Sequence, residues 1–127
     1  MTTPRFSLRS TVLGSPDPRS LASFYRALLD WEVIEDADDW VVLKPGGNRD
    51  ATGLSFQREE RHVPPTWPAG EGDQQMQLHL DIAVDDLAEG ESRALALGAM
   101  LAQHQPQDDV RVLLDPAGHP FCLFQRS

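Results

Sequence analysis

The cysteine of this chain, Cys122, lies three residues after His119 in the segment DPAGHPFCLFQR. Imidazole and thiolate are both zinc ligands, and an imidazolium beside a cysteine can lower the pKa of the thiol and make it nucleophilic. A simpler interpretation is inert packing, because Cys122 lies among Phe121, Leu123 and Phe124, and free cysteine is one of the most buried residue types. Whether Cys122 is a zinc ligand, a nucleophile or a packed side chain depends on the strands and helices that position these residues.

The first half of the chain predicts a strand, a helix and three more strands. FSLRSTVLGS has β character, and WEVIE, WVVLK and LSFQR are short β-type runs between turn-rich segments. Asp17 precedes Pro18, which is a typical helix start, since aspartate caps free amides and proline suits the first helical position. An apolar helical face follows at spacings of three and four, made of Leu21, Phe24, Tyr25, Leu28 and Leu29.

The second half repeats this order. QMQLHLDIAV alternates as a strand, DDLAEGESRALALG is typical of a capped helix, and AMLAQHQ, VRVLL and PFCLFQ predict three strands. The apolar face of the first of these strands, predicted to meet the helices, holds Met76, Leu78, Leu80, Ile82 and Val84. The opposite face, predicted to look into a cavity, holds Gln77, His79, Asp81 and Ala83.

Local matches support a duplication with an offset of about seventy residues. VVLKPGG parallels VLLDPAG, and SFQR parallels LFQR. We therefore predict one domain built of two modules, about 6–60 and about 76–126. The Pro/Gly-rich stretch of about 61–75 is predicted to be the loop between them.

Composition excludes several classes of protein. The net charge is −9 with scattered Lys and Arg, so no basic stripe for nucleic acid is expected. No apolar run is long enough to span a membrane, and the N-terminus has no apolar core of signal-peptide length. We expect a cytoplasmic protein without membrane association. A single cysteine forms no internal disulfide.

Several segments resemble the vicinal oxygen chelate superfamily, which includes glyoxalase I, bleomycin-resistance proteins and extradiol dioxygenases. They are SPDPRSLASFYRALLDWEV, LHLDIAVDDL, ALGAML and LLDPAGHPFCLF, and together with PPTWP they resemble a glyoxalase-like branch common in actinobacteria. The resemblance implies an α+β fold in which two βαβββ modules form a cup-shaped, mostly antiparallel eight-stranded sheet. One sheet face would pack on helices and the other would line a cavity.

The same resemblance implies where a metal would bind. Metal-dependent members carry ligands on the first and last strands of each module, and these positions map here onto Ser10, Leu54, His79 and Cys122. Serine is a poor ligand and leucine is none, so the usual metal site and any cofactor are not expected. One narrower possibility is a divalent metal such as zinc on His79 and Cys122, which the fold would place on neighbouring strands, with an oxygen from Asp81 or Gln77.

We predict a ligand pocket from the cavity-facing positions and from Trp67 in the proline-stiffened loop. His79, Asp81 and Cys122 are the candidate catalytic residues, with Asp81 as a possible general base. The predicted pocket residues are Ser10, Val12, Leu54, Phe56, Trp67, Gln77, His79, Asp81, Cys122 and Phe124.

Three alternative functions agree with these residues and with the family resemblance. The first is a metal-independent small-molecule binder of sequestering or resistance type, as the resemblance to bleomycin-resistance proteins implies. The second is a metal-dependent, glyoxalase-like lyase or isomerase, or a dioxygenase, that uses His79. The third is a non-catalytic partner module, which predicts a cavity no larger than a few water molecules. The family resemblance also implies a homodimer and an unknown small molecule as partners.

Overall fold

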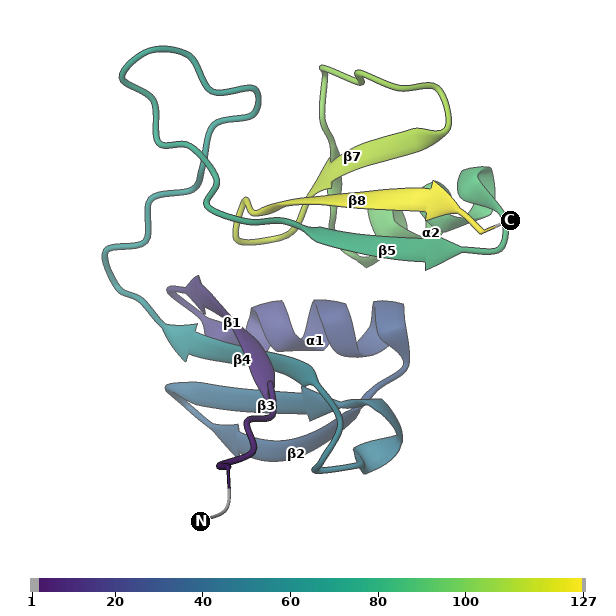
Figure 1. Cartoon of the computed structure of the whole chain (residues 1–127). Coiled ribbons are helices and arrows are strands. Elements are labelled where there is room, and N and C mark those ends of the chain that lie inside the picture. The colour runs from purple at the N-terminus through teal and green to yellow at the C-terminus, as the bar shows by residue number, and fades with distance from the viewer. Residues whose placement is uncertain (1–2, 127) are drawn as a thin grey trace. The chain divides into compact units, whose positions relative to one another are not determined.

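The computed structural model describes residues 3–126 and divides the chain into two compact units. The first unit ends at Glu59 and the second begins at Glu60, so the Pro/Gly-rich loop belongs to the second unit. Each unit contains a four-stranded mixed sheet and one long helix (Figure 1). The predicted α+β class with the repeated βαβββ order is therefore confirmed.

Unit 1 forms a sheet in the order β1-β4-β3-β2. The β1 and β4 strands are parallel, and the other neighbouring pairs are antiparallel. Its elements are β1 (Ser10–Ser15), α1 (Pro18–Leu29), β2 (Glu32–Ala37), β3 (Trp40–Lys44), a short 3₁₀ turn η1 (Pro45–Gly47) and β4 (Gly53–Arg58).

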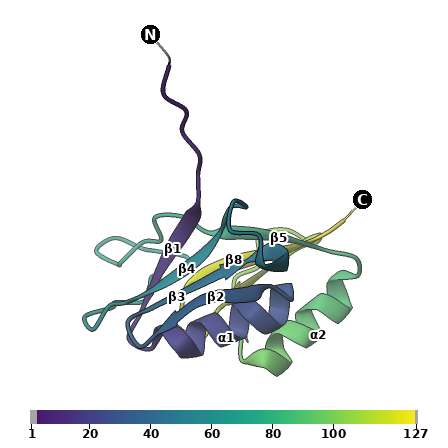
Figure 2. The same cartoon turned by 90° about the horizontal axis from the view of Figure 1, so that it is seen from below.

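The α1 helix begins and packs as its sequence predicts. The Asp17 carboxylate accepts a hydrogen bond from the Ser20 amide at 3.1 Å, and Pro18 occupies the first turn. Leu21, Phe24 and Tyr25 are buried, and the helix lies along one face of its own sheet (Figure 2). A stripe of apolar side chains at helical spacing thus anchors α1 on the strands.

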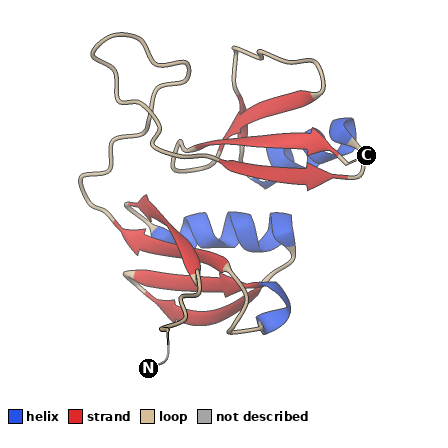
Figure 3. Cartoon of the chain, viewed as in Figure 1, coloured by secondary structure: helices blue, strands red, loops and turns tan. Residues whose placement is uncertain are grey.

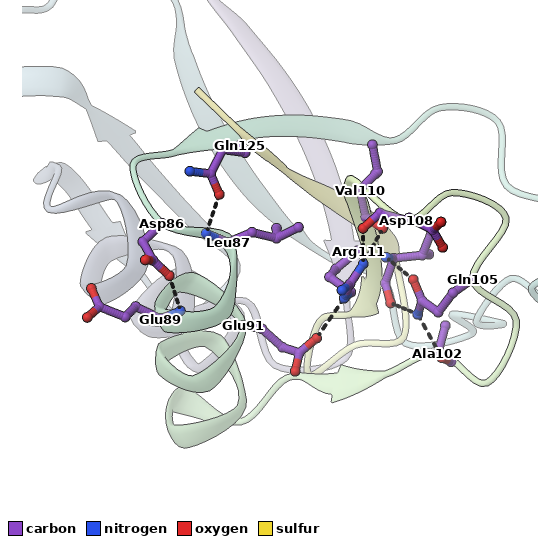
Figure 4. Close-up of polar contacts among 11 residues, drawn as sticks. Asp86, Leu87, Glu89, Glu91, Ala102, Gln105, Asp108, Val110, Arg111 and Gln125 are labelled. Carbon is purple, nitrogen blue, oxygen red and sulfur yellow. Dashed lines mark hydrogen bonds and ion pairs between the residues drawn. The ribbon is translucent and has the colours of Figure 1, made fainter. Parts of the chain in front are cut away.

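Unit 2 repeats this arrangement, with the strand order β5-β8-β7-β6 and a parallel β5–β8 pair. The Asp86 carboxylate caps α2 by accepting from the Glu89 amide at 2.9 Å (Figure 4). Gly98 ends the helix with a φ of 120°, a conformation that glycine adopts without steric cost. The elements are β5 (Leu80–Val84), α2 (Leu87–Leu97), β6 (Met100–Leu101), β7 (Val110–Leu114) and β8 (Pro120–Gln125).

Two strands of unit 2 are shorter than predicted. The strand predicted from about residue 76 begins only at Leu80, and the AMLAQHQ strand is reduced to Met100–Leu101 (Figure 3). Residues before Leu80 belong to a loop, so strand alternation does not determine where their side chains point. Met76 was therefore wrongly predicted to face the helices, and it lines a pocket instead.

The eight strands are present, and the structure groups them into two separate four-stranded sheets. Among residues 3–126, the ladder hydrogen bonds join strands of the same unit, and each sheet contains one parallel pair among antiparallel ones. Within residues 3–126, no helix has the length and apolar character needed to cross a membrane.

Two predicted pocket residues, Leu54 and Phe56, lie on the wrong face of unit 1. Phe56 is fully buried, and its ring stacks on Tyr25 of α1 with a centroid distance of 5.8 Å. Leu54 alternates with Phe56 on the same, helix-covered face and is also buried. The side chain between them, Ser55, points to the opposite face, where its hydroxyl meets that of Ser10.

Candidate functional site

The face of the unit 2 sheet opposite α2 carries the candidate chemistry. Asp81 on β5 pairs directly with Cys122 on the parallel β8 strand. Directly paired residues on neighbouring strands project from the same face, and so do residues two apart along one strand. Asp81 and Cys122 therefore share one face. His79 lies in the loop just before β5, and its donor atom lies within 4.8 Å of theirs, so the predicted proximity of His79 to Cys122 is present in the structure.

This face opens into a pocket of about 190 Å³. Its walls are mostly apolar, and its polar groups are few, as is typical of a small-molecule site. Valine side chains of β7 form one wall, because Val112 pairs directly with Cys122 and Val110 lies two residues away. The lining residues are Trp67, Met76, His79, Pro106, Gln107, Val110, Val112, Pro120 and Cys122.

The long loop between Glu60 and Leu80 contributes Trp67 and Met76 and is attached to the β6–β7 and β7–β8 loops. The Trp67 indole donates a hydrogen bond to the His104 carbonyl at 3.3 Å. His62 lies 2.8 Å from the Ala117 carbonyl through Nε2, and its ring lies 4.9 Å from that of His119. These contacts hold the tryptophan ring as a wall of the pocket.

A second loop, between β6 and β7, contributes Pro106 and Gln107. Gln105 holds this loop against β7 (Figure 4). Its amide nitrogen donates to the Ala102 and Val112 carbonyls, and its amide oxygen accepts from the Val112 N–H, each at 2.8 Å. One side chain thus satisfies three backbone groups and fixes the loop beside the pocket.

His79 and Cys122 form the polar end of the pocket, and Asp81, a predicted pocket residue, lies beside both of them but outside the pocket lining. His79 Nε2 lies 3.1 Å from Asp81 Oδ1, and one donor atom from each of the three residues lies within 4.8 Å of the others. Burial raises the pKa of the Cys122 thiol, and the charge and hydrogen bonding of Asp81 raise it further. The charge of Asp81 and the burial of the thiol both disfavour the thiolate form of Cys122. The surroundings of Cys122 therefore oppose its activation as a nucleophile.

We expect the alkylation of Cys122 to be slow at neutral pH. Thiolate is the reactive form, and a raised pKa moves the midpoint of the rate–pH profile above that of a cysteine in an unfolded peptide. As pH rises, the Cys122 thiol loses its proton in the unfolded chain before it does so in the folded chain. The contribution of this thiol to folding stability is therefore present at neutral pH and lost at alkaline pH. Iodoacetamide labelling followed by intact-mass spectrometry measures the profile, because the chain has one cysteine.

The matched variants are Asp81→Asn, which should move the midpoint down, and Asp85→Asn, which should leave it in place. Asp85 follows the same strand but its side chain is 88% exposed and pairs with Arg126. A wild-type midpoint below that of a free cysteine would contradict this prediction and would favour the nucleophile interpretation.

Unit 1 has weak donors at the corresponding positions. Ser10 and His79 stand equally far before the helix caps Asp17 and Asp86, so they are equivalent. Val12 pairs with Ser55 as Asp81 pairs with Cys122, which makes Ser55, and not Leu54, the counterpart of Cys122. The Ser10 and Ser55 hydroxyls bond to each other at 2.6 Å.

The donors that each unit offers do not fit the hard divalent ion that the fold family implies. Hard cations need about six oxygen or nitrogen donors. Unit 1 offers two neutral hydroxyls, and the last strand of unit 2 offers a thiol in place of a carboxylate.

Other predicted pocket residues have different positions. Gln77 is exposed and does not line the pocket, and Phe124 lies on the face of Cys122 but is 38% exposed and outside the pocket lining. Val12 lies on the exposed face of β1. Sequence reasoning missed Met76, Pro106, Gln107, Val110, Val112 and Pro120. The alternation of VRVLL opposite PFCLF could have identified the two valines, whereas the loop residues carry no periodic signal.

Comparisons with known proteins agree with this architecture. The profile of the glyoxalase-like domain family matches residues 10–124. A glyoxalase/bleomycin resistance protein/dioxygenase family enzyme from Burkholderia phytofirmans superposes with a TM-score of 0.71 at 18% identity, covering 94% of this chain and 98% of that one. No curated protein matches the chain.

Two further solved structures share the fold. The fosfomycin resistance protein FosX from Mesorhizobium loti has a TM-score of 0.64 at 13% identity, covering 99% of this chain and 95% of that chain. TnmS3, an antibiotic-binding protein from a Streptomyces species, has a TM-score of 0.62 at 17% identity, covering 99% and 100%. The chain therefore belongs to the glyoxalase-like domain family and has the fold of the vicinal oxygen chelate superfamily.

Proposed function

We propose that this protein binds a compact, largely apolar small molecule in the unit 2 pocket, as a sequestering or resistance-type protein. The observation that carries the proposal is the pocket of about 190 Å³, which has apolar walls and a polar group at one end. An engineered apolar cavity of about 150 Å³ holds benzene, so this pocket suits one ring or a similar group. Two proteins of the same fold are named for antibiotic resistance and antibiotic binding, which supports this class of ligand.

Binding in this pocket uses burial and shape, with His79 and Gln107 available for orientation. The proposed function does not depend on the hard divalent ion of the family. A volume of 190 Å³ exceeds that of a few water molecules at about 30 Å³ each, so it does not favour a partner module with a filled cup. The catalytic alternative depends on an ion at His79, and a stoichiometric transition metal in the purified protein that is lost in His79→Ala would favour it over the metal-independent binder.

Titration with indole, followed by amide and indole N–H shifts in nitrogen–proton correlation NMR, tests the proposal. Chelator is present throughout, so that no metal contributes. We expect saturable shifts at the Trp67 indole and at Val110 and Val112. Trp67→Ala should weaken binding roughly fivefold to tenfold, because a well-placed aromatic contact is worth about 1 kcal/mol.

A pair of filling variants provides the control. Val110→Trp places a large ring in the pocket and should abolish the shifts, whereas Leu101→Trp adds the same ring to exposed β6 and should preserve them. Indole binding that survives Val110→Trp, or an absence of saturable shifts in the wild type, would contradict the proposed site.

We also propose a homodimer, as the family resemblance implies. Light scattering coupled to size-exclusion chromatography measures the mass in solution. A mass near 14.1 kDa at all concentrations would reject the dimer without affecting the pocket.

A further inference from the structure

The carboxylate of Asp81 stands at the rim of the unit 2 pocket. Asp81 lies outside the lining, but it pairs directly with Cys122, which lines the pocket. Its Oδ1 atom lies 3.1 Å from Nε2 of His79, another lining residue, and the donor atoms of the three side chains lie within 4.8 Å of one another. The Asp81 side chain is 62% exposed, so its carboxylate can also meet a group that a bound ligand extends from the pocket.

The two neighbours of Asp81 leave its negative charge available to a ligand. An ionised carboxylate offers about four acceptor positions on its two oxygens. His79 and the Cys122 thiol are the side chains that lie against it. A neutral imidazole and a neutral thiol can each donate a hydrogen bond, but neither cancels the charge, so the carboxylate can still accept from a cationic donor.

The charged side chains around the pocket also favour a cation. Among the described residues that line the pocket, none is Lys or Arg. Arg111 of β7 projects toward α2, on the other face of the sheet, where it pairs with Glu91 at 3.2 Å (Figure 4). Asp108 and Asp109 directly follow the lining residue Gln107 and are exposed, so they add negative charge to this end of the unit.

We propose that the ligand of the unit 2 pocket carries a protonated amine beside its apolar ring, and that Asp81 is the residue that selects this group. The inference rests on the proposed function, because it assigns a class of ligand to the same pocket. The ring replaces water against the apolar walls, and the ammonium group donates charge-assisted hydrogen bonds to the carboxylate at the rim.

Asp81 acts on specificity in two ways. It attracts an amine more strongly than a neutral hydroxyl, since charge-assisted hydrogen bonds are stronger than those between neutral groups. It also disfavours a ligand that carries a carboxylate, since like charges side by side repel. The preference is modest in size, because the carboxylate is largely exposed and water screens its charge.

Three indole derivatives of similar size test the proposal on the full chain. Tryptamine carries an ammonium group, tryptophol carries a hydroxyl on the same two-carbon arm, and indole-3-acetate carries a carboxylate. Each is titrated with chelator present and followed by the NMR shifts of the Trp67 indole, Val110 and Val112. The titrations are made at pH 8, above the range in which imidazole ordinarily gains its proton, so that His79 does not cancel the charge of Asp81.

We expect tryptamine to bind roughly threefold to fivefold more tightly than tryptophol, which is the size of effect that a partly exposed ion pair gives. Indole-3-acetate should bind more weakly than tryptophol. The advantage of tryptamine should shrink in about 1 M salt, because salt screens the attraction between exposed charges.

Asp81→Asn keeps the shape of the side chain, removes its charge and should bring the affinities for tryptamine and tryptophol together. Asp85→Asn is the matched control, because it removes the same charge just after the end of the same strand. The Asp85 side chain is 88% exposed and pairs with Arg126, so this variant should keep the preference for tryptamine. Circular dichroism establishes that both variants are folded.

The outcomes separate this inference from the proposed function. Saturable binding of tryptamine and tryptophol with equal affinity, or a preference for tryptamine that persists in Asp81→Asn, would overturn the role of Asp81 and leave the pocket as proposed. Absence of saturable shifts with all three compounds would contradict the pocket itself and the inference with it.

Discussion

Replacing Phe121 by alanine should lower the free energy of unfolding by about 3–5 kcal/mol, the usual cost of deleting a buried phenylalanine side chain. Phe121 is fully buried on the helix-facing side of β8. The substitution removes its apolar contacts and leaves a cavity that the sheet and α2 cannot fully close. Urea unfolding followed by circular dichroism measures the change, and the slope of the transition should stay constant.

Phe124→Ala is the matched control for this prediction, because it makes the same chemical change three residues away on the same strand. Phe124 is 38% exposed and projects from the opposite face. Its loss should cost well under half of the Phe121 effect, since less apolar area is removed from contact. Equal losses in the two variants would contradict the assigned faces of β8 and, with them, the position of Cys122.

The second large effect is expected at Gly53, the first residue of β4. A Cβ atom at this position would lie 2.2 Å from the Leu43 carbonyl oxygen and 2.7 Å from Cδ of Lys44. Neither neighbour can easily move, because Leu43 belongs to β3 and the buried Lys44 donates hydrogen bonds to the Arg9 and Ala51 carbonyls. Gly53→Ala should therefore displace a strand and reduce the free energy of unfolding by about 2 kcal/mol or more.

Gly14→Ala is the control, since Gly14 lies in β1, in the same sheet. Its Cβ would meet the Cβ of Glu59 at 3.3 Å, a contact that a shift of a few tenths of an ångström relieves, and Glu59 lies just after the end of β4. We expect a change of less than about 1 kcal/mol in the same urea measurement, as for most exposed positions. A Gly53→Ala protein as stable as Gly14→Ala would show that β4 is not held as closely to β3 as described.

Much of the fold was predictable from the sequence because its signals are local. The Asp17–Pro18 start of α1, the apolar stripe that follows it and the Asp86 cap of α2 all act within one or two helical turns. The short repeats indicated the duplicated order of elements, which the structure confirms. The predicted strand lengths were less accurate. The alternation in QMQLHL begins several residues before Leu80, which is the first residue of β5 that is paired with another strand.

The face on which each strand residue lies could not be predicted from the sequence at every pocket position. SFQR and LFQR align by letters, but the ladders place Ser55, and not Leu54, at the position of Cys122. A shift of one residue exchanges the two faces of a strand, so Leu54 and Phe56 were predicted on the open face although they pack under α1. Only the pairing of strands distant in the sequence decides between the two registers.

For the chemistry, the sequence by itself determined which reactive groups exist: one cysteine, four histidines and a His-x-Asp pair on a predicted strand. The sequence did not establish a pair between Cys122 and the nearby His119. In the structure, the His119 ring lies beside that of His62. The family resemblance implied that Cys122 lies near His79, and the tertiary structure added the direct pairing of Cys122 with Asp81, since the parallel β5–β8 ladder brings together residues about forty positions apart. The tertiary structure also decided the walls of the pocket. Trp67 is placed by a hydrogen bond to a residue 37 positions away, and the loop that carries Pro106 is held by the hydrogen bonds of Gln105, and no periodic pattern in the sequence encodes either.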